Sequence, residues 1–275
     1  MDPRHSPDRD ELIGIWDATS TGFLDLAASL DDQQWSAPTP CPGWTAGDLV
    51  SHVIDIEQLL DQAPRPQHEP DWDALPHATG DVGRFTEVGV DVRRGRTRDD
   101  VVAELRATLA ARRTALSALP SDAEVLSPFG RPTTQERLLR MRILDTWVHE
   151  QDIRRAIGQP GGMASDGAIV ALQVFLDGLP KAWAKQVGAP AGSVAHVVIS
   201  DVGRGVEAWV LVGEDGQGAM SAPVDDPDVE LTLGWDDFLT LAAGRAEPES
   251  VHGRVHVGGS PERGARLLAS LTMTP

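Results

Sequence analysis

The feature that most constrains the fold of this chain is a change in hydrophobic periodicity near Gly188. Before it, apolar residues recur every three or four positions over long segments, which is the period of an α-helix that buries one face. After it, the segments VAHVVIS, VEAWVLVG and VELTLG are short, β-branched and alternating, as strands are. We therefore expect an α-helical domain over residues 1–187 and a smaller α+β domain over residues 188–275.

The first domain should contain helices separated by turn-forming residues. Thr45 is a good helix N-cap, with Asp48 in place of the glutamate of a capping box. The stretch from Ala63 to about Gly89 is rich in Pro, His, Asp and Gly and predicts a loop. A loop of this length is unusual in a compact domain unless it lies over a site. The expected helices cover approximately residues 10–30, 45–60, 99–119, 133–158 and 165–187.

The second domain should also contain two helices. WDDFLTLAAG predicts a helix, RVHVGG predicts a strand, and SPERGARLLASL predicts a final helix with Ser260 as N-cap and Pro261 in its first position. His252 and His256 have no evident carboxylate partner, and we expect both on the surface.

Composition and charge exclude several classes of protein. The net charge of −18 argues against binding to the phosphate backbone of nucleic acids, which needs clustered Lys and Arg, and it favours solubility instead. No run approaches the roughly 18 apolar residues of a membrane span, and the polar N-terminus lacks the apolar core of a signal peptide. We therefore expect a cytoplasmic protein that does not enter a membrane.

Cysteine and lysine are both scarce. Cys41 is the only cysteine, so an intramolecular disulfide and a zinc site built on several thiolates are excluded. Its place between two prolines favours a packed turn over a nucleophile. All basic residues except Lys181 and Lys185 are arginines, and Tyr and Asn are absent, which is typical of a GC-rich bacterial genome.

Three ionisable residues interrupt predicted buried helix faces. His52 follows Leu49 by three positions and precedes Ile56 by four, so it lies on the buried stripe of its helix. Asp145 and His149 are one turn apart, so their side chains can reach a common point. Two imidazoles and a carboxylate suit zinc or a similar ion, with positions left for water or substrate. The predicted inward face of the later helix carries Leu138, Met141, Asp145, Val148, His149, Asp152 and Ala156.

Patterning alone leaves other interpretations open. His52 could be a hydrogen-bonded core histidine, and Asp145 could orient His149 or pair with an arginine such as Arg142. Asp152 could fix the tautomer of a ligating histidine, or it could pair with a neighbouring arginine.

Two segments resemble the mycothiol-dependent maleylpyruvate isomerase family, whose helical bundle belongs to the wider DinB-like group. They are CPGWTAGDLVSHV at residues 41–53 and RILDTWVHEQDIRRAIG at residues 142–158. Residues 229–245 and 255–271 are similar to that family's second domain, which has a sterol-carrier-protein-like α+β fold. The resemblance covers most of the chain apart from residues 63–98, and it implies an up-down four-helix bundle followed by a small α+β domain.

The resemblance also implies a site and its chemistry. In the family, a histidine and an acidic-x-x-x-His pair bind zinc, and the matching residues here are His52, Asp145 and His149. The isomerase has Glu where this chain has Asp145, whose side chain is one methylene shorter. Arg245 is the candidate catalytic residue that would steady an anionic substrate, although it could also be a solvent-facing cation at a helix C-terminus.

The implied function is that of a zinc-dependent, actinobacterial enzyme with mycothiol as cosubstrate. The thiol, held as a thiolate, would attack a small electrophile. The outcome would be either cis–trans isomerisation of a maleylpyruvate-like acid or transfer of the thiol, and the sequence leaves both open. DinB-like bundles often lack assigned chemistry, so a non-enzymatic metal-containing binding or stress-response protein is the alternative.

Overall fold

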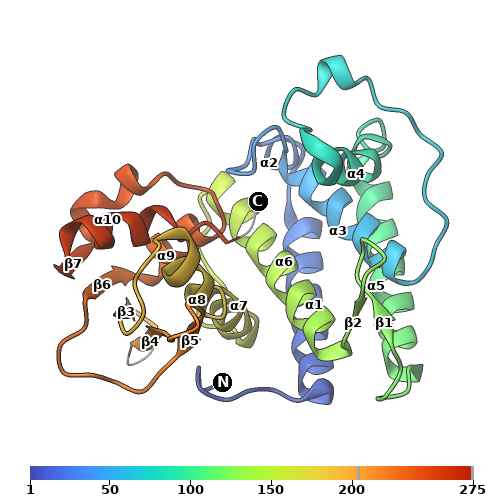
Figure 1. Cartoon of the computed structure of the whole chain (residues 1–275). Helices are drawn as coiled ribbons and strands as arrows, with labels where there is room; N and C mark the ends of the chain where they lie inside the picture. Colours follow the sequence, from blue (N-terminus) through green and yellow to red (C-terminus); the bar gives the residue numbers. More distant parts are fainter. Residues whose placement is uncertain (203–204, 274–275) are drawn as a thin grey trace. The chain divides into compact units, whose positions relative to one another are not determined.

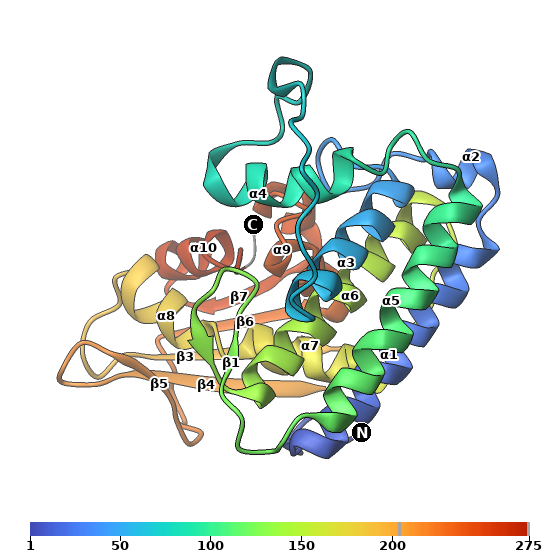
Figure 2. The same ribbon diagram turned by 90° about the vertical axis from the view of Figure 1, so that its right-hand side faces the viewer.

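The computed structural model of the chain describes residues 1–202 and 205–273. It forms two compact units, Met1–Ala171 and Leu172–Pro275, and the division between them falls inside helix α7 (Asp166–Leu176). The first unit is mainly helical and the second contains a five-stranded sheet (Figures 1 and 2). This confirms the expected fold class, while the exact domain boundary after residue 187 stays a prediction.

Four long helices form the body of the first unit, namely α1 (Arg9–Ser29), α3 (Ala46–Leu60), α5 (Arg98–Ala118) and α6 (Gln135–Ala156). Contacts join α1 to α6, α6 to α3, α3 to α5 and α5 back to α1, so these helices close into a bundle. Each matches a helix expected from the hydrophobic period. The shorter elements are α2 (Asp32–Trp35), a 3₁₀ turn (Trp72–Ala74), α4 (Gly80–Asp91), β1 (Val125–Leu126) and β2 (Pro132–Thr133).

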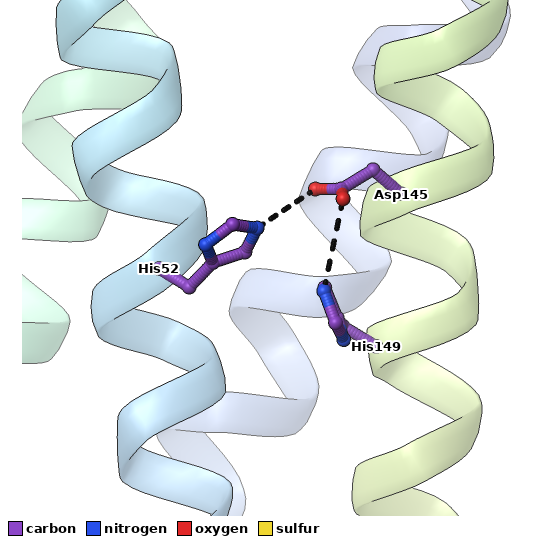
Figure 3. A group of neighbouring side chains, drawn as sticks. All are labelled: His52, Asp145 and His149. Carbon is purple, nitrogen blue, oxygen red and sulfur yellow. Dashed lines mark ion pairs between the residues drawn. The ribbon is translucent and has the colours of Figure 1, made fainter. Parts of the chain in front are cut away.

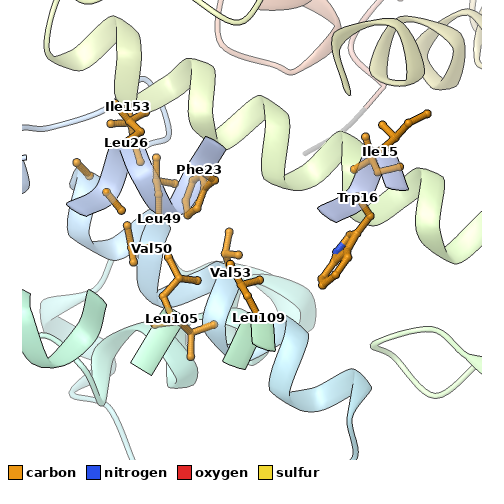
Figure 4. Packing of buried hydrophobic residues seen from close by; sticks show 14 of the residues in the cluster. Ile15, Trp16, Phe23, Leu26, Leu49, Val50, Val53, Leu105, Leu109 and Ile153 are labelled. Atoms are coloured by element: carbon orange, nitrogen blue, oxygen red, sulfur yellow. The ribbon is translucent and has the colours of Figure 1, made fainter. Parts of the chain in front are cut away.

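The core of the bundle takes side chains from all four long helices (Figure 4). Phe23 from α1, Leu49 from α3, Leu105 from α5 and Ile153 from α6 are each fully excluded from solvent. Burial of such side chains is the main favourable term in folding, at about 25 cal/mol for each Å² of apolar surface. Because the core fixes the rotation of each helix, polar residues on neighbouring faces keep a defined position.

Helix α3 begins where the sequence predicts. The hydroxyl oxygen of Thr45 accepts a hydrogen bond from the backbone N–H of Asp48 (3.2 Å), and the Asp48 carboxylate accepts one from the backbone N–H of Thr45 (2.9 Å). This capping box satisfies two N–H groups that the helix itself cannot pair. It also sets the start of the helix, which places His52 about two turns along α3.

The expected loop from Ala63 to about Gly89 was wrong in part, because α4 begins at Gly80. Glycines lower helix propensity and interrupt the apolar period, which is why the pattern does not indicate this helix. Packing requires one of them: a Cβ on Gly89 would lie 2.1 Å from Cγ of Asp55 on α3. The close packing of α4 against α3 therefore stabilises α4, whose own helix propensity is low.

The helix expected over residues 165–187 is broken into pieces. α7 ends at Leu176, α8 (Leu179–Lys181) follows, and a π-helix covers Ala182–Gln186. Pro180 lies at the start of α8, where its missing N–H costs no helical hydrogen bond.

The second unit is built on a sheet with the strand order β5-β4-β3-β6-β7. β3 and β6 are parallel and the other neighbours are antiparallel. In β6 the alternate residues Val229, Leu231 and Leu233 are buried, as expected when one face of a sheet covers a core. The elements are β3 (Val194–Ser200), β4 (Val206–Val212), β5 (Gly218–Met220), β6 (Val229–Gly234), α9 (Trp235–Ala242), a 3₁₀ segment (Pro248–Arg254), β7 (His256–Gly259) and α10 (Pro261–Ala269).

These elements confirm the strands and helices expected after Gly188. α10 has Ser260 as its N-cap and Pro261 in its first position, as predicted. Among the described residues, no helix combines the length and apolar character needed to cross a bilayer.

We expect Leu105→Ala to destabilise the first unit by about 2–5 kcal/mol, because it opens a cavity in a core from which Leu105 is fully shielded. Urea unfolding followed by circular dichroism measures the change. Leu126→Ala removes the same atoms from a side chain that is 57% exposed, and it should shift stability by no more than about 0.5 kcal/mol. Equal losses in the two variants would contradict the assignment of the core.

Candidate metal centre

His52 on α3 and Asp145 and His149 on α6 point toward one another inside the bundle (Figure 3). Nε2 of His52 lies 3.4 Å from Oδ2 of Asp145, and Nε2 of His149 lies 3.7 Å from Oδ1 of Asp145. One candidate ligand atom from each side chain lies within 4.8 Å of the other two, and no other such group of His, Cys, Asp or Glu occurs among the described residues. The three residues expected from the sequence therefore converge, while their role as ligands stays a prediction.

Asp145 is held in place by Arg142, which is one turn earlier on α6. Nη1 of Arg142 donates a hydrogen bond of 2.9 Å to Oδ2 of Asp145. Burial alone would raise the pKa of Asp145, but Arg142 and the two histidines together hold that pKa well below its usual range. The carboxylate is therefore ionised at neutral pH and can act as an oxygen donor.

His149 is oriented by a second carboxylate on its own helix. Nδ1 of His149 lies 3.2 Å from Oδ2 of Asp152, which is fully buried. A carboxylate oxygen can only accept, so it favours the tautomer that carries the proton on Nδ1. The lone pair of His149 is then on Nε2, the nitrogen that faces Asp145. This geometry fits the interpretation in which Asp152 fixes the tautomer of a candidate ligand.

His52 is kept neutral by its surroundings. Burial lowers the pKa of His52 more than the nearby Asp145 raises it. Its Nδ1 is buried and has no hydrogen-bond partner among the described residues. Because a neutral imidazole is the form that binds a metal, burial prepares this side chain for coordination.

These three side chains fit a divalent first-row ion. Two imidazole nitrogens and one carboxylate oxygen are a common donor set for such ions, and three protein ligands leave positions open for water or another ligand. Asp145 is the most exposed of the three, with 29% of its side chain accessible. Met141, one turn earlier, is 41% exposed and does not lie on the inward face as expected. Solvent therefore reaches the group at Asp145, whereas the two histidines are buried.

Trp44 packs against both histidines, which the sequence pattern did not indicate. Its ring centroid lies 5.1 Å from that of His52 and 6.3 Å from that of His149. Nε1 of Trp44 donates a hydrogen bond of 2.8 Å to Glu87, a carboxylate on α4 that is 1% exposed. Helix α4, in the segment expected to be a loop, thus fixes the aromatic ring beside the candidate ligands.

The sequence pattern also did not predict the role of Glu57, because a single glutamate on an otherwise apolar helix has no distinctive spacing. It is fully buried, and its Oε1 accepts hydrogen bonds from Nε of Arg142 (2.8 Å) and Nε1 of Trp16 (3.4 Å). Nε of Arg112 lies 3.3 Å from Oε2 of Glu57. One carboxylate on α3 thus links α1, α5 and α6 beside the metal centre.

The remaining candidates lie elsewhere in the chain. Arg245 lies just beyond the C-cap of α9 in the second unit, and its Nη1 donates a hydrogen bond of 2.8 Å to the carbonyl of Ala243. Its catalytic role stays a prediction. Cys41 is half-buried in the turn before α3, and His252 and His256 are both exposed, as expected.

Comparison with known proteins gives the family of the first unit. Residues 16–154 match the family model described as the mycothiol maleylpyruvate isomerase N-terminal domain, and this range contains all three candidate ligands. Uncharacterized proteins from two strains of Mycobacterium tuberculosis are 24% identical over 133 residues, which cover 48% of this chain and 51% of theirs. The chain thus spans about half the length of these curated relatives.

Solved structures extend the likeness in fold to both units. The crystal structure of a mycothiol-dependent maleylpyruvate isomerase has a TM-score of 0.55 at 19% identity, and that of its histidine-to-alanine mutant has a TM-score of 0.57 at 16% identity; each covers 93% of this chain and 96% of the other. Sterol carrier protein 2 from Yarrowia lipolytica covers 38% of this chain and 89% of its own, but its TM-score of 0.29 is too low to establish a shared fold. The match over residues 16–154 is decisive, and the chain belongs to the mycothiol maleylpyruvate isomerase N-terminal domain family.

Proposed function

We propose that this protein is a metal-dependent enzyme that uses a low-molecular-weight thiol, mycothiol, to attack a small electrophile. The observation that carries the proposal is the convergence of His52, Asp145 and His149 inside the domain that defines the family. The solved relatives are named as mycothiol-dependent isomerases, which is the source of the proposed cosubstrate.

The proposed ligands are His52, Asp145 and His149, and zinc is the proposed ion. Zinc bound there would supply a positive charge that keeps a thiol ionised as its thiolate at neutral pH. Asp152 would keep the proton of His149 on Nδ1, so that Nε2 remains free to bind. Trp44 would keep water from the side of the two imidazoles, and the thiol and the electrophile would approach from the side on which Asp145 is partly exposed.

Two outcomes of the attack remain within the proposal. Addition to a cis double bond, rotation and elimination would isomerise a maleylpyruvate-like acid and return the thiol, whereas retention of the thiol on the product would be S-transfer. Arg245 is the proposed partner of a substrate carboxylate or of developing negative charge. Both outcomes need the metal centre, so metal binding is tested first.

We expect about one transition-metal ion per chain in the purified, zinc-supplied protein, and we expect His149→Ala to lose it, because two remaining donors bind a divalent ion weakly. Elemental analysis after gel filtration measures the ratio of metal to protein. His252→Ala, which removes an exposed histidine of the second unit, should keep the ion. A wild-type protein that takes up no metal would overturn the proposal.

Asp152→Asn should weaken zinc affinity by about 10–100-fold, because an amide can also donate to Nδ1 of His149 and no longer fixes the tautomer. Competition with a chromophoric chelator gives the affinity, and circular dichroism confirms that the variant is folded. Unchanged affinity in a folded variant would show that Asp152 does not orient the ligand.

The zinc-loaded protein should consume an electrophile only when mycothiol is present, and the apoprotein should not. With maleylpyruvate, isomerisation with no net loss of free thiol identifies an isomerase, while loss of free thiol with a bimane electrophile identifies an S-transferase. Metal-bound protein that does neither would favour the non-enzymatic binding or stress-response alternative.

A further inference from the structure

Arg142 is fixed beside the metal centre by bonds on two sides. Its Nε donates to Oε1 of Glu57 (2.8 Å) and its Nη1 donates to Oδ2 of Asp145 (2.9 Å). Only 5% of the Arg142 side chain is exposed, so the guanidinium cannot swing into solvent. An arginine in a protein stays protonated, which makes it a permanent positive charge next to a candidate ligand.

Because Arg142 bonds only one oxygen of Asp145, the two carboxylate oxygens have different surroundings. Oδ2 accepts the hydrogen bond from Arg142, whereas Oδ1 is the oxygen nearest to Nε2 of His149. A hydrogen bond to Oδ2 fixes the plane of a carboxylate that is one methylene shorter than the glutamate of the family pattern. Arg142 therefore positions Asp145 and at the same time offsets its charge.

Arg142 belongs to a row of side chains with alternating charge that starts at Asp145. Arg142 pairs with Asp145 and with Glu57. Glu57 also pairs with Arg112, whose Nη1 lies 2.7 Å from Oδ1 of Asp61. Among these groups Arg142 is the one in direct contact with the candidate ligand, so its charge acts on the centre most strongly. Glu57, one step further away, offsets part of that effect.

We propose that Arg142 is a positioning and charge-setting residue that makes the metal centre select anionic ligands, such as a thiolate, over neutral ones. The inference rests on the metal site of the proposed function. Two neutral imidazoles and a carboxylate paired with a guanidinium carry almost no net charge, so a divalent ion at the centre keeps most of its charge for a further ligand. Without Arg142, the carboxylate would neutralise more of that charge, and less of it would be left to attract an anionic ligand.

Cobalt-substituted protein provides the test, because its visible absorption reports ligands that bind to the ion. Azide serves as the anionic probe and imidazole as the neutral probe. The double variant Glu57→Gln/Arg142→Met removes one charge of each sign from the buried row, which avoids leaving Glu57 without its partner. We expect the double variant to bind azide at least about tenfold more weakly than wild type and to bind imidazole equally well.

Glu57→Gln alone is the matched variant, since it keeps Arg142 and removes the charge that offsets it. It should change azide affinity in the opposite direction, toward tighter binding, and should hold cobalt more weakly than wild type. A general loss of structure would shift both variants the same way and both probes together, and that result would overturn the proposal. If the double variant does not fold, the direction of the shift in Glu57→Gln decides the question.

The outcomes distinguish a failure of the metal site from a failure of the role of Arg142. Wild-type protein that binds no cobalt would overturn the metal site and this inference together. Wild-type protein that binds cobalt, with azide affinity unchanged in both variants, would overturn only the role of Arg142.

Discussion

The helical unit depends on how it pairs the charges that it buries. Glu57 is fully buried at the centre of the bundle, and an unpaired carboxylate there would cost several kcal/mol. Arg142 and Trp16 donate hydrogen bonds to it, and Arg112 forms an ion pair with it, from three other helices. The packing of the four helices thus brings the buried carboxylate of Glu57 together with two buried arginines. Apolar residues alone would tolerate several arrangements of similar burial.

The geometry of the candidate metal centre follows from that arrangement. Arg142, anchored on Glu57, holds Asp145, and Asp145 lies between His52 and His149. The candidate ligands are thus placed by the same contacts that align α3 and α6. Metal sites that bind tightly are preorganised in this manner, because the orientation of each ligand is fixed before the ion arrives. A site of this kind can remain ready for an exogenous ligand without a large rearrangement of the bundle.

A second support comes from outside the four long helices. α4 packs against α3 through Gly89, and Glu87 on α4 holds the indole of Trp44 beside the two histidines. The segment that links α3 to α5 is therefore part of the site, which gives it a role beyond that of a connection. The motifs at residues 41–53 and 142–158 lie outside this segment, and its own sequence gives no direct sign of this role.

The sequence by itself determined the four long helices, the order of the strands that follow them and the identity of the three candidate ligands. Helical spacing places His52 and the pair Asp145 and His149 on inward faces, because position along a helix sets the direction of a side chain. Only the tertiary structure decided how these groups are supported. Glu57 and Trp44 act through contacts with residues far away in the chain, and no local pattern encodes such contacts. The same holds for α4, since its helical propensity is weak and its packing on α3 stabilises it.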